Sequence, residues 1–305
     1  HIQQNTVITR SGLLRQQRGI PQGSVLSSLL CNFFYGQLEQ QHLLPLVNVQ
    51  STLMMRVVDD FLIISTDRDQ VTAVIERMSR GVSDYGCRLN AAKTLVNFEL
   101  VRGGQRVPQA ESSDFPWCGI LINDRTLDVA ADYSRLAPPI RLEETVTINV
   151  GREAGVALRQ KMLAAVRLKM HPLYTDSQLN SRQTVLLNLY QNFVLCAKKF
   201  HLICRRLPMR TGNHRYLISV IEDTIALAHI LLKCSCRKAS IAAQDVKWLG
   251  THAFHRVLAH KQARYPLLLA CLARALRHPD AIKLAQTHAS VVGSPSNGTV
   301  LAIGY

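Results

Sequence analysis

The sequence predicts a helix-dominated protein in which an α+β unit is followed by an all-helical bundle. Residues 1–133 mix apolar runs typical of strands with apolar residues at helical spacing, whereas past Tyr133 the helical spacing continues alone. The chain has 305 residues, 47% of them hydrophobic, which is enough for two domains or one large one. No uninterrupted apolar stretch is long enough to span a bilayer, and the eight cysteines, mostly in apolar segments, are typical of reduced thiols in the cytosol or nucleus.

The α+β unit is expected to begin with a hairpin, a loop and a helix. Thr6–Arg10 and Arg15–Arg18 flank a polar turn and predict two short paired strands. Gly19–Ser24 contains Gly and Pro and predicts a loop. Apolar residues recur at helical spacing over Ser24–Gln40, and the hydroxyl of Ser24 is a suitable N-cap, so a helix is expected there.

Two aspartates lie between apolar runs in the next segment. Leu53–Val58 and Phe61–Ser65 predict strands, and only Asp59 and Asp60 separate them, which predicts a tight hairpin with both aspartates in its turn. An adjacent carboxylate pair beside a hydrophobic core is costly. The pair is therefore either an ordinary surface turn or a site for a divalent metal ion, since Mg²⁺ prefers carboxylate oxygens.

Another helix and three further strands complete the α+β unit. Asp69–Gly81 is an amphipathic helix by the spacing of its apolar residues. Cys87–Asn90, Leu95–Leu100 and Trp117–Ile122 predict strands, and Arg102–Asp114 predicts a loop.

The second part of the chain is expected to be helical throughout. The predicted helices are Gly155–Met170, Ser177–Leu207, Tyr216–Lys233, Ala242–His260 and Pro266–His278. The tail Ser290–Tyr305 contains Gly and Ser and has no apolar period, which predicts a frayed end.

The positive charge of the chain lies entirely in its second part. The formal net charge is +15, with 12 basic and 13 acidic side chains in residues 1–133 and 24 basic and 8 acidic ones in residues 134–305. Such an asymmetry favours a polyanionic partner, most simply nucleic acid, over a basic surface that is merely solvated.

Several other residues are candidates for chemistry, each with an ordinary structural alternative. The glycines of Gly19–Ser24 allow close approach of backbone to a ligand. Lys93 is either a surface lysine or a cation beside a phosphate, and Trp117-Cys118-Gly119 is either core or a binding element. The candidate ligands for zinc are Cys234, Cys236, His252 and His255. A zinc site is disfavoured because their spacing fits no common structural site, and because buried thiols and surface histidines explain these residues.

The order of these segments resembles the telomerase reverse transcriptase family in its animal form. The resemblance covers about residues 5–275 and includes the small apolar Val58 before the aspartate pair. The segments similar to the family's motifs B, C, D and E are Arg18–Tyr35 (RGIPQGSVLSSLLCNFFY), Arg56–Thr66 (RVVDDFLIIST), Gly81–Phe98 (GVSDYGCRLNAAKTLVNF) and Phe115–Ile122 (FPWCGILI). Those similar to its C-terminal thumb extension are Leu163–His171, Leu179–Tyr190 and Val246–Phe254.

The resemblance implies the fold and activity of a polymerase. Residues 1–123 are expected to form part of the fingers and palm of a reverse transcriptase, and residues 124–305 a helical thumb. The family is an RNA-directed DNA polymerase that extends telomeric DNA 3′ ends from an RNA template by phosphoryl transfer with two Mg²⁺ ions. The implied partners are telomerase RNA, the DNA 3′ end, the RNA–DNA duplex, dNTP and upstream RNA-binding and fingers regions of the same protein, without a membrane. The implied location is the telomere, in the nucleus.

The resemblance also assigns roles to single residues. Asp59 and Asp60 are expected to bind metal, with Asp59 the stronger candidate, and Lys93 to give a proton to the leaving pyrophosphate. The residues implied to lie against the nucleotide and template are Gln22, Gly23 and Ser24, and those of the primer grip are Trp117, Cys118 and Gly119. The implied contacts with the nucleic-acid backbone are Arg152, Arg159, Lys161, Arg167, Lys169, Lys198 and Lys199.

The sequence departs from the family pattern at one catalytic position. The family takes a third aspartate from a motif A, and nothing similar precedes Gly19. This chain is therefore expected to be a piece of a longer protein and to be inactive alone. Two alternatives stay open: a reverse transcriptase of a mobile element or intron, which shares the loop and the aspartate pair, and a truncated nucleic-acid-binding module without catalysis.

Overall fold

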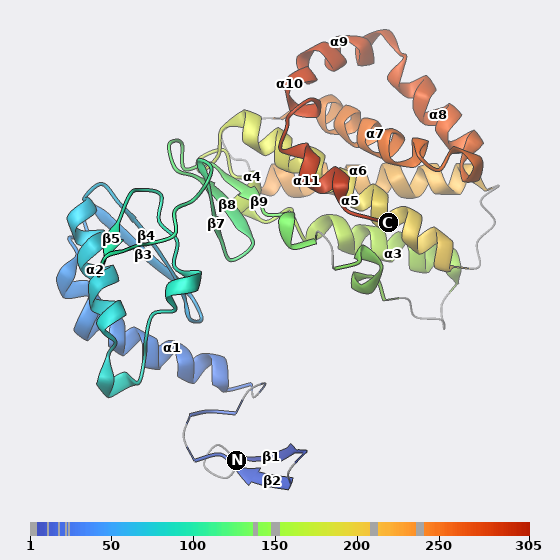
Figure 1. Ribbon diagram of the computed structural model, residues 1–305. Helices are drawn as coiled ribbons and strands as arrows, with labels where there is room; N and C mark the ends of the chain where they lie inside the picture. The colour runs from blue at the N-terminus through green and yellow to red at the C-terminus, as the bar shows by residue number, and fades with distance from the viewer. Residues whose placement is uncertain are drawn as a thin grey trace. The chain divides into compact units, whose positions relative to one another are not determined.

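The chain folds into two compact units, His1–Glu111 and Ser112–Tyr305 (Figure 1). The computed structural model describes residues 5–10, 12–17, 19–21, 23, 25–136, 140–147, 153–207, 213–235 and 241–305. The expected domains divided at residue 123, but strand β8 (Ile120–Asn123) pairs with β9 (Val129–Ala131). The compact units therefore divide before this sheet, and the assignment of functional domains stays a prediction.

The first unit begins with a hairpin and a helix, as expected, but the second strand begins at Gly12, three residues before the predicted Arg15. Strands β1 (Thr6–Thr9) and β2 (Gly12–Arg15) pair antiparallel. Helix α1 (Ser27–Leu38) starts later than predicted, after Leu26, which makes no side-chain cap bond, and it continues as a π-helical turn, Glu39–Leu43. The predicted cap, Ser24, lies outside the described residues.

The core of the first unit lies between a hairpin and two helical segments. Strands β3 (Thr52–Val57) and β4 (Asp60–Ser65) pair antiparallel, and α2 (Arg68–Arg80) follows. The Asp67 carboxylate accepts hydrogen bonds from the backbone N–H groups at the start of α2, which stabilises the helix end. One buried cluster of this core comprises Leu38, Leu43, Val74 and Val82. The helix predicted over 69–81 is confirmed.

Two predicted strands of this unit are wrong. Cys87–Asn90 and Leu95–Leu100 make only the isolated bridges Val82–Cys87 and Val96–Gln109. Two 3₁₀ turns, Ser83–Tyr85 and Ala91–Lys93, precede them in the chain. Gly86, with φ +60°, reverses the chain, so that Cys87 bonds back to Val82. Leu89 bonds to Met78 on α2, and Val96 bonds to Pro108 and Ala110, so neither segment forms a strand ladder. The following loop contains one minimal ribbon, β5 (Val101–Arg102) with β6 (Gln105–Arg106).

The second unit opens with a three-stranded antiparallel sheet in the order β7-β8-β9. Strand β7 (Asp114–Trp117) pairs with β8. The single strand predicted over Trp117–Ile122 is therefore wrong. Cys118 and Gly119 have φ values of +47° and +84°, and two successive positive values make a tight type I′ hairpin turn.

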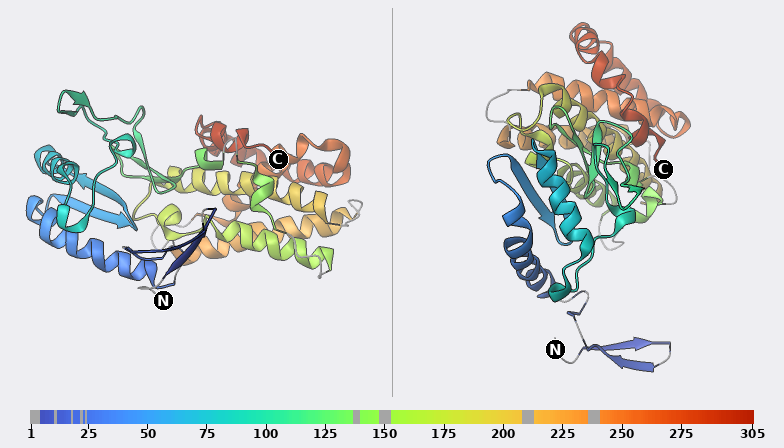
Figure 2. Two further views of the ribbon diagram at one scale, coloured as in Figure 1. Left: turned by 60° about the horizontal axis from the view of Figure 1, so that its bottom comes forward. Right: turned by 60° about the vertical axis from the view of Figure 1, so that its left-hand side comes forward.

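Helices build the rest of the second unit, as the sequence predicts. Figure 2 shows them packed side by side in both views, with α5 in contact with α3 and α7. Among the described residues no helix is long and apolar enough to cross a membrane. Their bounds are α3 (Ala154–Arg167), α4 (Pro172–Thr175), α5 (Arg182–Arg206), α6 (His214–Ser235), α7 (Ala243–Ala259), α8 (Pro266–Leu276), α9 (Pro279–Thr287), α10 (Ala289–Val292) and α11 (Asn297–Ala302).

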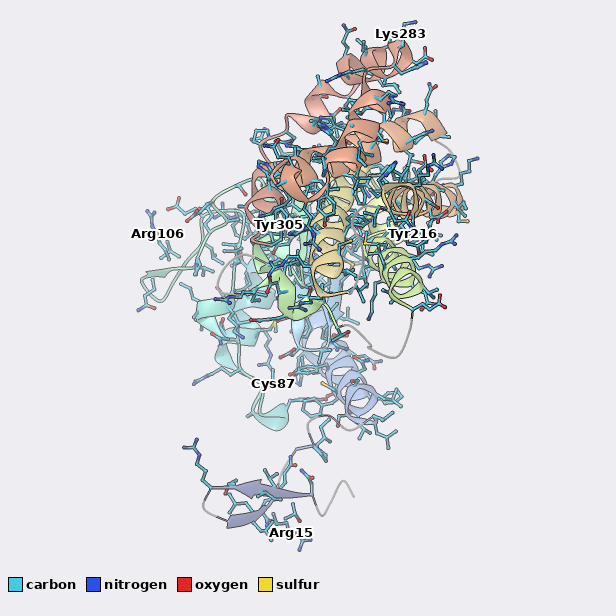
Figure 3. The ribbon with its side chains drawn as sticks, turned by 90° about the vertical axis from the view of Figure 1, so that its right-hand side faces the viewer. Arg15, Cys87, Arg106, Tyr216, Lys283 and Tyr305 are labelled. Atoms are coloured by element: carbon cyan, nitrogen blue, oxygen red, sulfur yellow. The ribbon has the colours of Figure 1, made fainter. Side chains whose placement is uncertain are left out.

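The C-terminal segment is ordered, contrary to the predicted frayed end at 290–305. Val300 is fully buried, and the Tyr305 hydroxyl donates to the carbonyl of Val257 at 2.8 Å. The Lys198 ammonium donates to the carbonyls of Leu301 and Ile303 at 2.7 and 2.5 Å. Figure 3 shows Tyr305 against the helices of its unit. Tertiary contacts thus order a tail whose own sequence carries no helical period.

Candidate active site and nucleic-acid interface

The aspartate pair lies at the tip of the β3–β4 hairpin. Val57 pairs with Asp60, so the turn consists of Val58 and Asp59, and Asp60 is the first residue of β4. The predicted turn was one residue further along the chain. Val58 has φ +59°, and one positive value at the first turn position matches the type II′ turn that the twist of a hairpin favours.

This turn exposes both aspartates while holding one neighbour in a strained conformation. Asp59 and Asp60 are exposed to solvent. A β-branched residue such as Val58 rarely adopts a positive φ, because its side chain crowds the backbone. Such strain persists only where surrounding contacts fix the backbone.

An arginine fixes the turn from within the hairpin. The Nη1 atom of Arg56 donates to the carbonyl of Val58 at 2.6 Å and to Oδ1 of Asn32 on α1 at 3.0 Å. Its Nε atom donates to the Glu39 carboxylate in the π-helical turn. The turn is therefore tied to α1 and to the segment that follows it.

Aromatic rings cover the same arginine. The centroid of the Tyr35 ring lies 5.2 Å from the Arg56 guanidinium carbon, and that of the Phe61 ring lies 5.8 Å from it. Burial raises the pKa of the Tyr35 phenol, and the charges of Cys87, Cys31 and Asp59 act in the same direction. Tyr35 thus stays a neutral phenol beside the turn at neutral pH.

The two carboxylates suit a magnesium ion that also binds substrate phosphates. Mg²⁺ takes oxygen ligands and is commonly held by one or two carboxylates, with phosphates and water completing its coordination. Asp59 and Asp60 supply such carboxylates on an exposed turn. Over the described part of the chain, no cluster of three or more His, Cys, Asp or Glu side chains could hold a metal by itself. The two carboxylates therefore fit a metal site that substrate phosphates complete, and not one formed by protein ligands alone.

Other candidates of the first unit lie on loops. Gly23 is exposed with φ +83°, whereas Gln22 and Ser24 lie outside the described residues. Lys93 is exposed at the end of a 3₁₀ turn, which the Asn90 side chain caps by accepting from the backbone N–H of Ala92 at 3.1 Å. The structure brings Asp59 and Asp60 together, while the approach of Lys93 and Gly23 to them stays a prediction.

The predicted primer grip is the turn between β7 and β8, in the second unit. Trp117 ends β7, and Cys118 and Gly119 form the type I′ turn. The carbonyl of Gly119 accepts from the backbone N–H of Asp132 at 3.1 Å. A Cβ atom on Gly119 would lie 3.3 Å from Nη1 of Arg135, so the turn leaves little room for a side chain.

Lys198 does not belong to a nucleic-acid surface, contrary to prediction. Its residue surface is 1% exposed, and its ammonium donates to the carbonyls of Leu301 and Ile303. Burial lowers the pKa of Lys198 to about 8. Its neighbour Lys199 is half-buried, and burial lowers its pKa as well. The Lys198 cation holds the C-terminal segment and is not available to a phosphate.

The other residues predicted to contact the nucleic-acid backbone differ in how exposed their side chains are and in the partners they bond. Arg167 is exposed at the end of α3, and Lys161 donates to the Thr147 hydroxyl at 3.4 Å. Arg159 is exposed but forms an ion pair with Asp223 at 3.0 Å. Lys169 lies near the rings of Tyr133 and Tyr174, and burial lowers its pKa. Arg152 lies outside the described residues.

Sequence reasoning missed Arg56, which the structure places at the centre of the aspartate hairpin. In the sequence, Arg56 is only the first residue of the segment similar to motif C. A signal was present, since an arginine inside an apolar strand is rarely buried unless a carboxylate pairs with it. The carboxylate, Glu39, is 17 positions away in sequence, and only the fold shows the pairing.

Comparisons with known proteins agree with this geometry. The family profile "Telomerase reverse transcriptase, C-terminal extension" matches residues 156–273, and "Reverse transcriptase (RNA-dependent DNA polymerase)" matches residues 5–120. The telomerase reverse transcriptase of Canis lupus familiaris is 37% identical over 279 residues, which cover 86% of this chain. That of Bos taurus is 38% identical over 281 residues, with the same coverage. The chain belongs to the telomerase reverse transcriptase family.

The relatives are much longer than this chain. It spans 25% of the length of the dog and cattle proteins. A solved structure of telomerase from Candida albicans, in complex with a fragment of telomeric RNA, aligns with a TM-score of 0.56 at 16% identity, over 87% of this chain and 37% of that one. This likeness shows the fold. The predicted class, a partial reverse-transcriptase palm followed by a helical thumb, is confirmed.

Proposed function

We propose that this chain is part of an RNA-directed DNA polymerase that extends telomeric DNA 3′ ends from an RNA template. The observation that carries the proposal is the β3–β4 turn, which exposes Asp59 and Asp60 on a hairpin tied to α1. Fixed, exposed carboxylates on a regular element suit a reaction that depends on metal placement. The membership of the chain in this family gives the reaction class.

The aspartates would hold Mg²⁺ together with the phosphates of the incoming dNTP. Metal held there would supply activation of the attacking 3′ oxygen and stabilisation of the charge on the leaving pyrophosphate. Asp59 is in the turn and Asp60 begins β4, so the two carboxylates are fixed to one rigid hairpin. Two carboxylates leave coordination sites for substrate. The chain alone lacks a motif A aspartate, and we expect it to be inactive.

The loop residues would act on the nucleotide. Lys93, a cation on an exposed turn, would offset the charge of the leaving pyrophosphate and donate a proton to it. The positive φ of Gly23 allows its backbone to approach a base or sugar closely. Gln22 and Ser24 flank it in sequence and share this assignment.

The second unit would hold the nucleic acid. The hairpin of Trp117, Cys118 and Gly119 would position the DNA 3′ end as the primer grip. Arg167 and Lys161 would contact phosphates of the RNA–DNA duplex, which contributes affinity without sequence preference. Further partners in this proposal are the telomerase RNA and the upstream RNA-binding and fingers regions, and the place of action is the telomere in the nucleus.

A primer-extension assay tests the proposal. The complete protein containing this chain, assembled with its RNA, should add nucleotides to a telomeric primer in the presence of Mg²⁺ and stop when EDTA is added or the RNA is digested. The isolated chain should add none. Extension that copies any supplied template equally well would favour a mobile-element reverse transcriptase. Binding of nucleic acid without extension by the complete protein would favour a non-catalytic module.

A further inference from the structure

We propose that Arg56 is a positioning residue that sets the orientation of the Asp59–Asp60 turn. This inference rests on the proposed function, because it assigns Arg56 a part in the reaction of that site. Arg56 does not coordinate the metal. It acts on the backbone that carries the first of the two aspartates, through its hydrogen bond to the Val58 carbonyl at 2.6 Å.

The guanidinium makes contacts in three directions. Toward the turn, Nη1 donates to the carbonyl of Val58, the residue directly before Asp59. Toward α1, Nη1 donates to Oδ1 of Asn32 at 3.0 Å. Toward the π-helical turn, Nε donates to the Glu39 carboxylate. One planar side chain therefore connects the catalytic turn to two other segments of the first unit.

The contact of Arg56 with Glu39 is partly protected from water, whereas its bonds to Val58 and Asn32 lie at the surface. The Arg56 side chain is 11% exposed and that of Glu39 is 21% exposed, while the Tyr35 and Phe61 rings lie near the guanidinium. Hydrogen bonds between charged groups are stronger when solvent does not compete for them. The arrangement is thus a rigid support beneath an exposed turn.

The turn needs such a support because Val58 is strained. Its φ of +59° is unfavourable for a β-branched residue, and the backbone would relax if nothing held it. Relaxation at Val58 would rotate the next peptide and move the Asp59 carboxylate. Lysine cannot replace this support, since its single ammonium lacks the planar fork that reaches all three acceptors.

A general stabilising role for a buried arginine is the competing explanation, and the chain offers a matched control. Arg77 on α2 donates to the carbonyl of Gly81 at 2.9 Å and contacts Nδ1 of His42 at 3.0 Å. Like Arg56, it donates to a backbone carbonyl and reaches a second segment, the π-helical turn, through His42. Neither contact involves a residue of the aspartate turn. If Arg56 acts only through stability, R56K and R77K should have similar effects.

The test compares R56K, R77K and the double variant R56K/V58G in the complete protein assembled with its RNA. The readouts are the single-nucleotide extension rate, the KM for dNTP, and the Mg²⁺ concentration that gives half-maximal rate, with thermal unfolding in parallel. R56K should lower the rate about 10- to 100-fold and raise the Mg²⁺ requirement, while R77K stays within about twofold. V58G should restore part of the R56K rate, because glycine adopts a positive φ without strain.

Three results would overturn the inference. They are a wild-type rate in R56K, equal losses in R56K and R77K, and a lowered R56K rate with an unchanged Mg²⁺ requirement. Failure of R56K to fold where R77K folds would make Arg56 a purely structural residue. If the wild-type complete protein does not extend a primer at all, the proposed function itself fails, and that result differs from all of these.

Discussion

The two units of the chain differ in the exposure of their charged candidate residues. In the first unit Asp59 and Lys93 are exposed on turns, Asp60 is exposed at the start of β4, and a largely buried arginine supports the aspartate turn. In the second unit, one basic residue predicted to bind nucleic acid, Lys198, is 1% exposed and bonded to two carbonyls. A charged residue type therefore does not by itself identify a binding surface. Exposure and hydrogen-bond partners decide between a site and a structural role.

The two hairpins with predicted functions also differ in how their turns are held. The β3–β4 turn puts Val58 at φ +59° and relies on the Arg56 side chain. The β7–β8 turn has glycine at its second position, and a backbone bond from Asp132 to Gly119 holds it. The first turn should thus be sensitive to the side chain of Arg56, and the second to its own glycine.

The largest effect on primer binding expected in the second unit follows from changing that glycine. Gly119→Val places a side chain at φ +84° and 3.3 Å from Arg135, which costs about 1–2 kcal/mol of strain and distorts the turn. We expect the KM for primer to rise about tenfold, with a smaller change in the rate at saturating primer. Gly104→Val is the control, since Gly104 has φ +78° and open space around it. An equal rise in primer KM for both variants would contradict the grip assignment.

Replacing Lys198 separates a structural lysine from a binding one. Lys198→Met keeps the volume but leaves the carbonyls of Leu301 and Ile303 without their donor, which should cost about 2–3 kcal/mol of unfolding free energy. Amide exchange over α11 should accelerate, and duplex affinity should stay unchanged. Lys283→Met on exposed α9 is the control and should leave α11 protected. A loss of duplex affinity without faster amide exchange would indicate that Lys198 binds the duplex.

A buried histidine should make the stability of the second unit depend on pH. Burial, with the nearby charges of Lys261, Arg264 and Arg205, lowers the pKa of His201 to about 4, from an ordinary value near 6.5. The unfolded chain therefore binds a proton between these values that the folded chain does not, so stability is lost as pH falls from 6.5 to 4. The full shift is worth about 3 kcal/mol, and solvent screening around the partly accessible ring reduces the expected loss to about 2 kcal/mol. His201→Gln should reduce this dependence in chemical denaturation but not abolish it, because burial also lowers the pKa of His252 to about 4. An unchanged slope would contradict the assignment.

The smallest effect is expected at the exposed end of α3. Arg167→Ala should weaken binding to an RNA–DNA duplex a few-fold and reduce the slope of log affinity against log salt by about one. Filter binding at several salt concentrations measures this, with Lys198→Met as the matched variant expected to leave the slope unchanged. Equal salt-dependence slopes for Arg167→Ala and wild type would indicate that Arg167 does not contact the duplex.

Sequence reasoning predicted the elements whose signals are local. The helices of the second unit follow from apolar spacing, and α2 also carries its own Asp67 cap. The predicted strands Cys87–Asn90 and Leu95–Leu100 failed because strand pairing depends on a partner that the local pattern does not contain. The ordered tail was missed for a similar reason, since its anchor, Lys198, lies 103 positions before Leu301.

The candidate site was predictable in part. The aspartate pair and its hairpin were found from two apolar runs, but the register differed by one residue because Val57, and not Val58, closes the turn. A shift of one position moves Asp60 from the turn into β4. The support by Arg56 depends on Asn32 and Glu39, which only the folded chain brings near it.

The central claim, that the exposed β3–β4 turn is catalytic, is tested most directly by Asp59→Asn in the complete protein assembled with its RNA. Single-turnover extension should fall by about a thousandfold or more, because the amide removes the charge that binds the metal, while primer affinity stays within about twofold of wild type. A near-normal extension rate in Asp59→Asn would contradict the claim, and so would a loss explained entirely by weaker primer binding.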